Sequence, residues 1–138
     1  MKRSNNLKFF IVDDDSFSRS LYQQHLINLG YNNNNVFDNG YDCLKKLNLQ
    51  PDIIFMDYDM HPLNGIEVLQ RIKQFNPNIY LLMISSNRDT EIMHAAMKYG
   101  AYDYITKGER DLEMISNVIQ QITLQYNQDS VASKAQPF

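Results

Sequence analysis

The sequence feature that most limits the fold is the alternation of short apolar segments with longer segments in which apolar residues recur every three or four positions. The short segments are Phe9–Val12, Val36–Phe37, Ile53–Met56, Ile79–Ile84 and Tyr102–Ile105. Continuous apolar character predicts strands that are covered on both faces. No hairpin turn joins two of them directly, and strands joined through helices pair in parallel by right-handed crossovers. We therefore predict an α/β fold with a doubly wound five-stranded parallel sheet and helices on both faces.

The longer segments predict five helices. The first covers 16–29, with Ser16 or Asp15 as its cap and Gly30 just past its end. The others are expected near 41–48, from Ile66 to Phe75, over 89–99, and from Leu112 to Ile122. The asparagine-rich segment 32–35 is expected to be a loop. Residues 1–126 are predicted to form one domain, and the polar, aperiodic residues 127–138 a C-terminal tail.

Charge and composition exclude several classes of partner. The net charge of −3 and the lack of any Lys/Arg run argue against direct nucleic-acid binding and against an acidic membrane surface. No stretch approaches the roughly 18 apolar residues of a membrane span. The single cysteine, Cys43, excludes an internal disulfide and fits a reducing cytoplasm. We interpret Cys43 as a small apolar helix residue, because no histidine or basic residue clearly pairs with it.

Polar residues follow four of the predicted strands, at the edge where ligands bind in doubly wound sheets. They are Asp13, Asp14 and Asp15 after the first strand, Asp57 after the third, Ser85 after the fourth and Lys107 after the fifth. Taken singly, the acidic triplet could be a solvated turn or helix cap, and the others a turn residue, a loop hydroxyl and a surface charge. Their joint placement at one edge favours a functional site.

The charges of these residues indicate the chemistry. Carboxylates crowded together repel one another and raise the pKa of at least one of them, and a divalent cation relieves the repulsion. The ligands are all oxygen, with no histidine or cysteine nearby, which favours Mg²⁺ over zinc or copper. A carboxylate beside such an ion, opposite an ammonium and a hydroxyl, suits phosphoryl transfer to an aspartate.

Three blocks of sequence, with Ser85–Ser86 between the second and third, resemble the receiver domain of two-component response regulators, a flavodoxin-like fold. The blocks are Phe10–Asp15 with Arg19, Asp57–Met60 with Gly65, and Gly100–Lys107, and the resemblance extends from Lys8 to about Tyr126. It implies a phosphoryl acceptor at Asp57. It further implies Mg²⁺ bound directly by Asp14, mostly through water by Asp13, and by the backbone carbonyl of Asp59. Ser85 and Lys107 would hold phosphoryl oxygens, and Tyr104 would be an aromatic switch that rotates inward when Ser85 moves.

The sequence departs from the family pattern after the acceptor and after the lysine. The family usually has proline four residues beyond the acceptor, where this chain has His61 followed by Pro62. We interpret His61 as a loop residue and not a catalytic base. The family lysine is typically followed by a cis proline, but Gly108 follows Lys107. A cis bond to a non-proline residue costs about 3 kcal/mol, so a trans bond or a strained one is expected there.

The resemblance implies a cytoplasmic signalling switch that is no enzyme beyond its own phosphorylation and autodephosphorylation. A sensor histidine kinase or phosphotransfer protein would supply the phosphoryl group, and the output would be contact with a downstream protein target. The first alternative is the N-terminal receiver of a longer regulator with a DNA-binding or enzymatic output domain. A second is an aspartate-dependent phosphatase or other hydrolase, and a third is an inactive receiver. We also hypothesise that the side chain of Asp59 alters the lifetime of the phosphoaspartate.

Overall fold

All five strands form one parallel sheet. A computed structural model describes the backbone of residues 6–135 and the side chains of residues 6–128. The strands are β1 (Phe9–Val12), β2 (Asn34–Phe37), β3 (Ile53–Met56), β4 (Tyr80–Ser85) and β5 (Asp103–Thr106), in the order β2-β1-β3-β4-β5. Each neighbouring pair is parallel. The predicted doubly wound α/β fold is confirmed.

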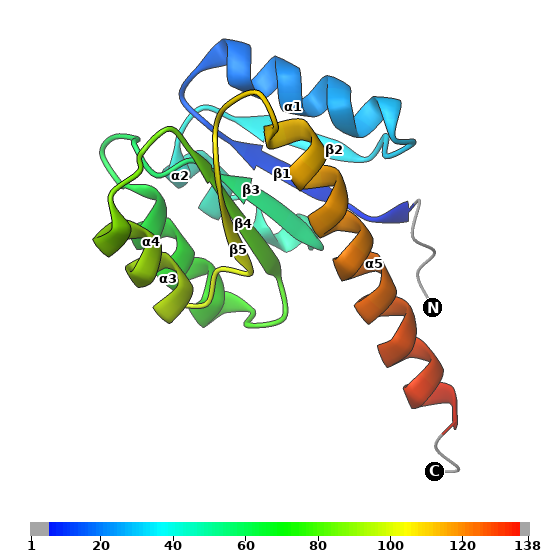
Figure 1. Cartoon of the computed structure of the whole chain (residues 1–138). Coiled ribbons are helices and arrows are strands. Elements are labelled where there is room, and N and C mark those ends of the chain that lie inside the picture. The colour runs from blue at the N-terminus through cyan, green and yellow to red at the C-terminus, as the bar shows by residue number, and fades with distance from the viewer. Residues whose placement is uncertain (1–5, 136–138) are drawn as a thin grey trace.

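Helices cover both faces of this sheet (Figure 1). They are α1 (Ser16–Asn28), α2 (Gly40–Leu44), the short 3-10 helix η2 (Leu47–Leu49), α3 (Gly65–Phe75), α4 (Thr90–Lys98) and α5 (Asp111–Ala135). The core cluster on one face joins the sheet to α2, α3 and α4, and the cluster on the other face joins it to α1 and α5. Phe10 and Val12 belong to the first cluster and Phe9 and Ile11 to the second, so both sides of β1 are buried. This explains why the strand reads as a continuous apolar run.

Side-chain caps define where several of the helices begin, among them α1, α3 and α4. Asp15 caps α1 by accepting the backbone N–H of Ser18. Asn64 and Glu67 form a capping box at the start of α3, and Asp89 caps α4. Each cap satisfies a backbone donor that has no partner within its own helix. These capped starts lie beyond the carboxyl ends of β1, β3 and β4, so the loops that carry the polar residues are anchored on both sides.

Two helices differ from the sequence prediction. The helix expected near 41–48 is shorter: α2 ends at Leu44 and η2 follows, before Gln50 adopts a left-handed conformation with φ of 59°. At the other end of the chain, the backbone is helical through Ala135, although a tail was expected from residue 127. Local hydrogen bonding sustains a helix through residues of fair propensity without an apolar stripe. Residues 136–138 of the expected tail lie outside the described residues.

No helix within the described part of the chain is both long enough and apolar enough to cross a membrane.

The first helical residue of α3, Gly65, packs against the backbone that follows β3. A Cβ placed on Gly65 would collide with the carbonyl oxygen of Asp57 and lie 2.9 Å from the Cα of Tyr58. The backbone N–H of Gly65 also donates to the carbonyl of Tyr58 at 2.9 Å. The absence of a side chain at Gly65 therefore allows α3 to approach the end of β3 closely.

We predict that Gly65→Ala lowers the free energy of unfolding by about 1–3 kcal/mol, because the new methyl group meets backbone atoms that cannot move aside independently. Urea denaturation of the metal-free protein measures this. Gly108→Ala is the matched control, because a Cβ there meets no atom within 4 Å and the φ angle is not in the left-handed region. Its stability should be unchanged or slightly higher. Equal stability of the two variants would contradict the close packing at Gly65.

Candidate functional site

The parallel register places the predicted polar residues side by side at one edge of the sheet. Val12 pairs with Met56 across β1 and β3, so Asp13 and Asp57 leave the sheet together. Ser85 pairs with Thr106 across β4 and β5, so Lys107 follows directly beside Ser85. The backbone N–H of Asp57 donates to the carbonyl of Val12 at 2.9 Å, and that of Lys107 donates to Ser85 at 3.0 Å. Backbone pairing therefore continues one residue beyond the strands and holds the site in register.

Three carboxylates form an acidic cluster at this edge. One carboxylate oxygen each from Asp13, Asp14 and Asp57 lie within 4.8 Å of one another. Asp13 and Asp57 are buried, with 2% and 6% exposed, whereas Asp14 is exposed. A group of this kind can hold a metal ion, and its all-oxygen character favours a hard cation. The exposed side at Asp14 leaves room for the water ligands that such ions retain.

Surrounding contacts fix the positions of Asp13 and Asp57. The backbone N–H of Asp15 donates to Asp13 Oδ1 at 2.9 Å, and Arg19 Nη1 donates to the Asp13 carbonyl at 2.7 Å. Asp57 Oδ1 accepts the backbone N–H of Tyr58 at 2.8 Å. The second carboxylate oxygen of Asp57 is directed toward the ammonium of Lys107.

Lys107 joins the two buried carboxylates. Its Nζ lies 2.9 Å from Asp13 Oδ2 and 3.8 Å from Asp57 Oδ2. Burial acts to lower the pKa of Lys107, but the bond to Asp13 and the nearby charges of Asp57, Asp13 and Asp15 outweigh it, so the pKa is raised. The ammonium therefore stays charged at neutral pH. It is bonded more closely to Asp13 than to Asp57.

The surroundings of Asp57 disfavour the ionised form of its carboxyl group. Burial, followed by the negative charge of Asp13, raises the pKa of Asp57 from 3.8 to about 6, although Lys107, Ser85 and the Tyr58 N–H act in the opposite direction. A bound cation would favour the ionised form and reverse this shift. The site is therefore arranged so that a cation and an ionised Asp57 stabilise each other.

Ser85 and Tyr104 both bond to the loop between β4 and α4. The Ser85 hydroxyl, fully buried, accepts the backbone N–H of Asn87 at 3.2 Å. The hydroxyl of Tyr104 donates to the carbonyl of the same residue, Asn87, at 2.7 Å. Tyr104 is half-buried and packs against the core cluster under α2, α3 and α4. The part played by Asn87 has no sequence signal, because only its backbone takes part.

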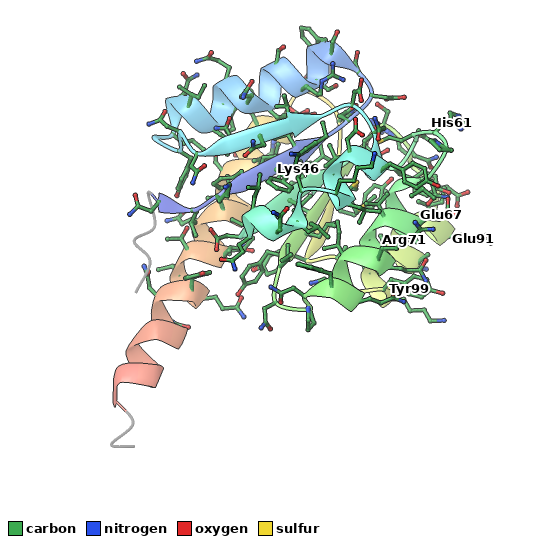
Figure 2. The ribbon with its side chains drawn as sticks, turned by 180° about the vertical axis from the view of Figure 1, so that it is seen from behind. Lys46, His61, Glu67, Arg71, Glu91 and Tyr99 are labelled. Atoms are coloured by element: carbon green, nitrogen blue, oxygen red, sulfur yellow. The ribbon has the colours of Figure 1, made fainter. Side chains whose placement is uncertain are left out.

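Asp59 and His61 lie in the exposed part of the loop after β3. His61 is at the outer edge of this loop (Figure 2), joined to Pro62 by a cis bond. Asp59 is also exposed, and its charge is among the influences that raise the pKa of Tyr104, after burial. In the described part of the chain His61–Pro62 is the only cis bond, so the bond between Lys107 and Gly108 is trans. Of the two conformations expected there, the unstrained one is present.

A hollow in the described surface lies at the opposite end of the sheet. It is lined by residues at the amino ends of β3 and β4 and by the α5 residue Tyr126, and it contacts none of the acidic cluster. Ligands of doubly wound sheets bind at the carboxyl ends of the strands. The acidic cluster is therefore the better candidate site.

Comparison with known proteins gives a single family. The family model described as "Response regulator receiver domain" matches residues 9–119. Chemotaxis protein CheY of Thermotoga maritima is 32% identical over 101 residues, which cover 72% of this chain and 84% of that protein. The protein-glutamate methylesterase/protein-glutamine glutaminase of Clostridium acetobutylicum is 31% identical and covers 90% of this chain. The DNA-binding transcriptional regulator NtrC of Escherichia coli is 30% identical and covers 71%. The chain spans only 38% and 21% of these last two proteins.

Solved structures show the same fold. A CheY-like receiver domain protein from Methanospirillum hungatei has a TM-score of 0.80 at 19% identity, and the match covers 89% of this chain and 98% of that one. A chain of the CheX-CheY-BeF3-Mg²⁺ complex from Borrelia burgdorferi has a TM-score of 0.75 at 23% identity, and the match covers 84% of this chain and 89% of that one.

The raised pKa of Asp57 predicts a stability difference between the metal-free protein and Asp57→Asn that depends on pH. Because folding raises this pKa, Asp57 favours the folded state below pH 4, and that contribution is lost as the pH rises through about 6. From pH 4 to pH 8, the wild type should therefore lose about 1–2 kcal/mol relative to Asp57→Asn, with solvent screening at the edge of the site taken into account.

Urea denaturation at both pH values in a chelator measures this difference. Added Mg²⁺ should then stabilise the wild type more than the Asn variant, because the cation binds only the folded site and prefers the intact carboxylate cluster. A difference that is independent of pH would contradict the crowding of Asp57.

Proposed function

The chain belongs to the response regulator receiver domain family, and on that premise we propose that Asp57 accepts a phosphoryl group in a Mg²⁺-dependent reaction. The observation that supports this most directly is the meeting of Asp13, Asp14 and Asp57 with Lys107 at one edge of the sheet. The donor would be a sensor histidine kinase or a phosphotransfer protein. The chain would then act as a switch and not as an enzyme with a separate substrate.

We propose that Asp13, Asp14 and Asp57 hold the Mg²⁺ ion, together with the backbone carbonyl of Asp59. The fit is supported by three carboxylates within 4.8 Å, all oxygen donors, one side of which is open to solvent. A related fold has been solved as a complex that contains BeF3 and Mg²⁺. When bound, Mg²⁺ would offset the negative charge that accumulates as the phosphoryl group approaches.

The protein's own groups account for the remaining requirements of the transfer. A carboxylate oxygen of Asp57 attacks phosphorus, forms an acyl phosphate bond, and the donor leaves with the electron pair of the broken bond. The charged Lys107, 3.8 Å from Asp57 in this structure, would bond a phosphoryl oxygen. The Ser85 hydroxyl would donate to another. Both interactions strengthen as negative charge develops on those oxygens.

Asn87 supplies the route by which phosphorylation would reach the surface. The Ser85 hydroxyl and the Tyr104 hydroxyl both bond to its backbone, at 3.2 Å and 2.7 Å. If Ser85 turns toward a phosphoryl oxygen, its bond to the Asn87 N–H changes, and the bond from the Tyr104 hydroxyl to the carbonyl of the same residue is affected with it. This couples the acceptor to α4, β5 and α5, the face that we propose contacts the downstream protein.

The wider setting follows from the same family. We propose a receiver unit over residues 1–126, located in the cytoplasm, with no direct contact to nucleic acid or membrane. A second candidate is the receiver part of a longer regulator with an enzymatic or DNA-binding output. It is supported by the methylesterase and NtrC relatives, of which this chain spans 38% and 21%. An aspartate-dependent phosphatase would have to turn over a phosphomonoester, and steady release of inorganic phosphate from such a substrate by pure protein would favour it.

Incubation with acetyl phosphate and Mg²⁺, followed by intact mass measurement, tests the proposal. We expect the wild type to gain one phosphoryl group, and we expect no gain for Asp57→Asn or for wild type in excess chelator. The reason is that Asp57 supplies the attacking oxygen and the cation offsets the charge. Asp52→Asn is the matched control, since Asp52 precedes the same strand at its other end and should leave the gain intact. A gain in Asp57→Asn equal to that of the wild type would overturn the assignment.

Asp59 provides a prediction about the phosphorylated lifetime. Its exposed carboxylate lies two residues beyond the acceptor, and we propose that its charge acts on a water that approaches the phosphoryl group. We expect Asp59→Asn to change the rate of phosphoryl loss by about 2–10-fold, the range expected for a single nearby charge, while Asp57 still accepts the group. The decay of the phosphorylated mass over time measures the rate. Identical decay in the two proteins would dispose of this role.

A further inference from the structure

Gly108, the residue after Lys107, gives the backbone high conformational freedom next to a side chain that has to be precisely placed. Gly108 is exposed, has open space where a Cβ would lie, and does not adopt a left-handed φ. Neither space nor conformation therefore requires glycine here, and glycine loses more conformational entropy on folding than any other residue. Yet Nζ of Lys107, the preceding residue, must be held 2.9 Å from one carboxylate and 3.8 Å from another. Some other interaction has to restrain this turn.

That restraint is provided by Asp111, the first residue of α5. Its Oδ2 accepts the backbone N–H of Gly108 at 3.4 Å, and its own backbone N–H donates to the Gly108 carbonyl at 3.3 Å. The two residues thus close the turn between β5 and α5 on both sides. Each bond is long, so the pair needs a further anchor to hold the turn in one conformation.

Tyr22, from the opposite end of the chain, is that anchor. Its hydroxyl donates to the same Asp111 Oδ2 at 2.8 Å, across a sequence separation of 89 residues. Tyr22 and Asp111 are only 2% and 6% exposed. Burial, followed by the bond and charge of Asp111, raises the pKa of Tyr22, so the phenol remains protonated and remains a donor. Its ring belongs to the core cluster of α1 and α5, and close packing in such a core limits the movement of the ring.

Tyr22 also lies directly beneath the acidic cluster. A small space below the site is lined by Asp13, Asp57 and Tyr22 together with apolar strand residues. The turn that carries Lys107 is therefore tied to the same helix whose first turn follows the acidic triplet. Through this link, α1 is connected both to the turn that carries the Lys107 ammonium and to the carboxylates that the ammonium bridges.

We propose that the buried Tyr22–Asp111 pair positions Lys107 by restraining the Gly108 turn, in place of the backbone restriction that proline would supply. Tyr22 and Asp111 are positioning residues in this role, since neither touches the acidic cluster's reacting oxygens. The proposal rests on the proposed phosphoryl acceptance at Asp57. It assigns to two residues outside the strand-end motifs a part in setting how well Lys107 meets the incoming group.

Equilibrium binding of beryllofluoride in saturating Mg²⁺, measured by calorimetry, tests the proposal, because the ammonium bonds this phosphoryl mimic. We expect Tyr22→Phe and Asp111→Ala each to weaken binding by about 5–10-fold, as small misplacements of a bonding group do. Asp111→Asn keeps an acceptor oxygen and should stay within about twofold of the wild type. The Mg²⁺ affinity of all three should change little, since the carboxylate ligands stay in place.

Tyr126→Phe is the matched control for the loss of a tyrosine hydroxyl. Tyr126 donates to Asp52 Oδ1 at 3.1 Å, a tyrosine–aspartate pair remote from the acidic cluster. It should bind beryllofluoride like the wild type, within about twofold. Circular dichroism melting confirms that each variant is folded at the temperature of the titration. Weakening in Tyr126→Phe equal to that in Tyr22→Phe would overturn the proposal, because the effect would then be general.

A double-mutant cycle with Lys107→Ala separates positioning from a merely structural role. If the pair acts through Lys107, adding Tyr22→Phe to Lys107→Ala should weaken binding by less than about twofold further. An equal loss in both backgrounds would overturn the proposal, and so would normal binding by Lys107→Ala alone. Gly108→Ala should restore part of the affinity lost in Tyr22→Phe, because it stiffens the turn directly.

The outcomes also separate this proposal from the proposed function. If the wild type neither gains a phosphoryl group from acetyl phosphate nor binds beryllofluoride with Mg²⁺, phosphoryl acceptance itself fails. If the wild type does both and Tyr22→Phe matches it in affinity, only the positioning role of the pair fails.

Discussion

The crowding of three carboxylates, two of them bridged by one ammonium, is the interaction on which the rest of the site depends. Asp13 and Asp57 are buried beside each other because their strands pair in register, and Lys107 alone cannot neutralise both. Burial, followed by the negative charge of Asp13, raises the pKa of Asp57. A hard cation would offset the negative charge, so the site combines a stored electrostatic cost with an affinity for the ion that relieves it. The backbone has to be rigid to maintain such an arrangement against mutual repulsion.

The backbone around the acidic cluster is held by contacts from residues that are not themselves part of the cluster. Gly65 lets α3 press against the carbonyl of Asp57, and Arg19 bonds the carbonyl of Asp13. The Tyr22–Asp111 pair ties the turn after Lys107 to α1. The interior of the fold thus contributes to function by limiting how far each strand end can relax. By contrast, Asp14, Asp59 and His61 face solvent, where ligands and partners can enter and leave.

The local pattern of apolar and polar residues in the sequence predicted most of the fold and most of the candidate site residues. Continuous apolar runs identified β1, β3 and β4, which are buried on both faces, and the polar residues that follow β1, β3, β4 and β5 were then site candidates because parallel strands end at one edge. The pattern was weaker at the partly exposed strand β2, which begins at Asn34, within the segment 32–35 that was expected to be a loop. The extents of two helices were not predictable in this way. The segment after Gly40 splits into α2 and η2, and α5 continues to Ala135, because hydrogen bonding within the backbone and not apolar periodicity decides those boundaries.

The sequence by itself determined which side chains gather at the carboxyl edge of the sheet. Strands that alternate with helices pair in parallel, so the residues that follow them all lie at that edge. Only the tertiary structure decided how they are bonded there. Lys107 lies closer to Asp13 than to Asp57, the Tyr104 hydroxyl donates to the backbone carbonyl of Asn87, and Tyr22 reaches Asp111 across 89 residues of sequence. Such contacts depend on the packing of helices against the sheet and on backbone groups that are common to every residue, and neither leaves a periodic trace in the chain.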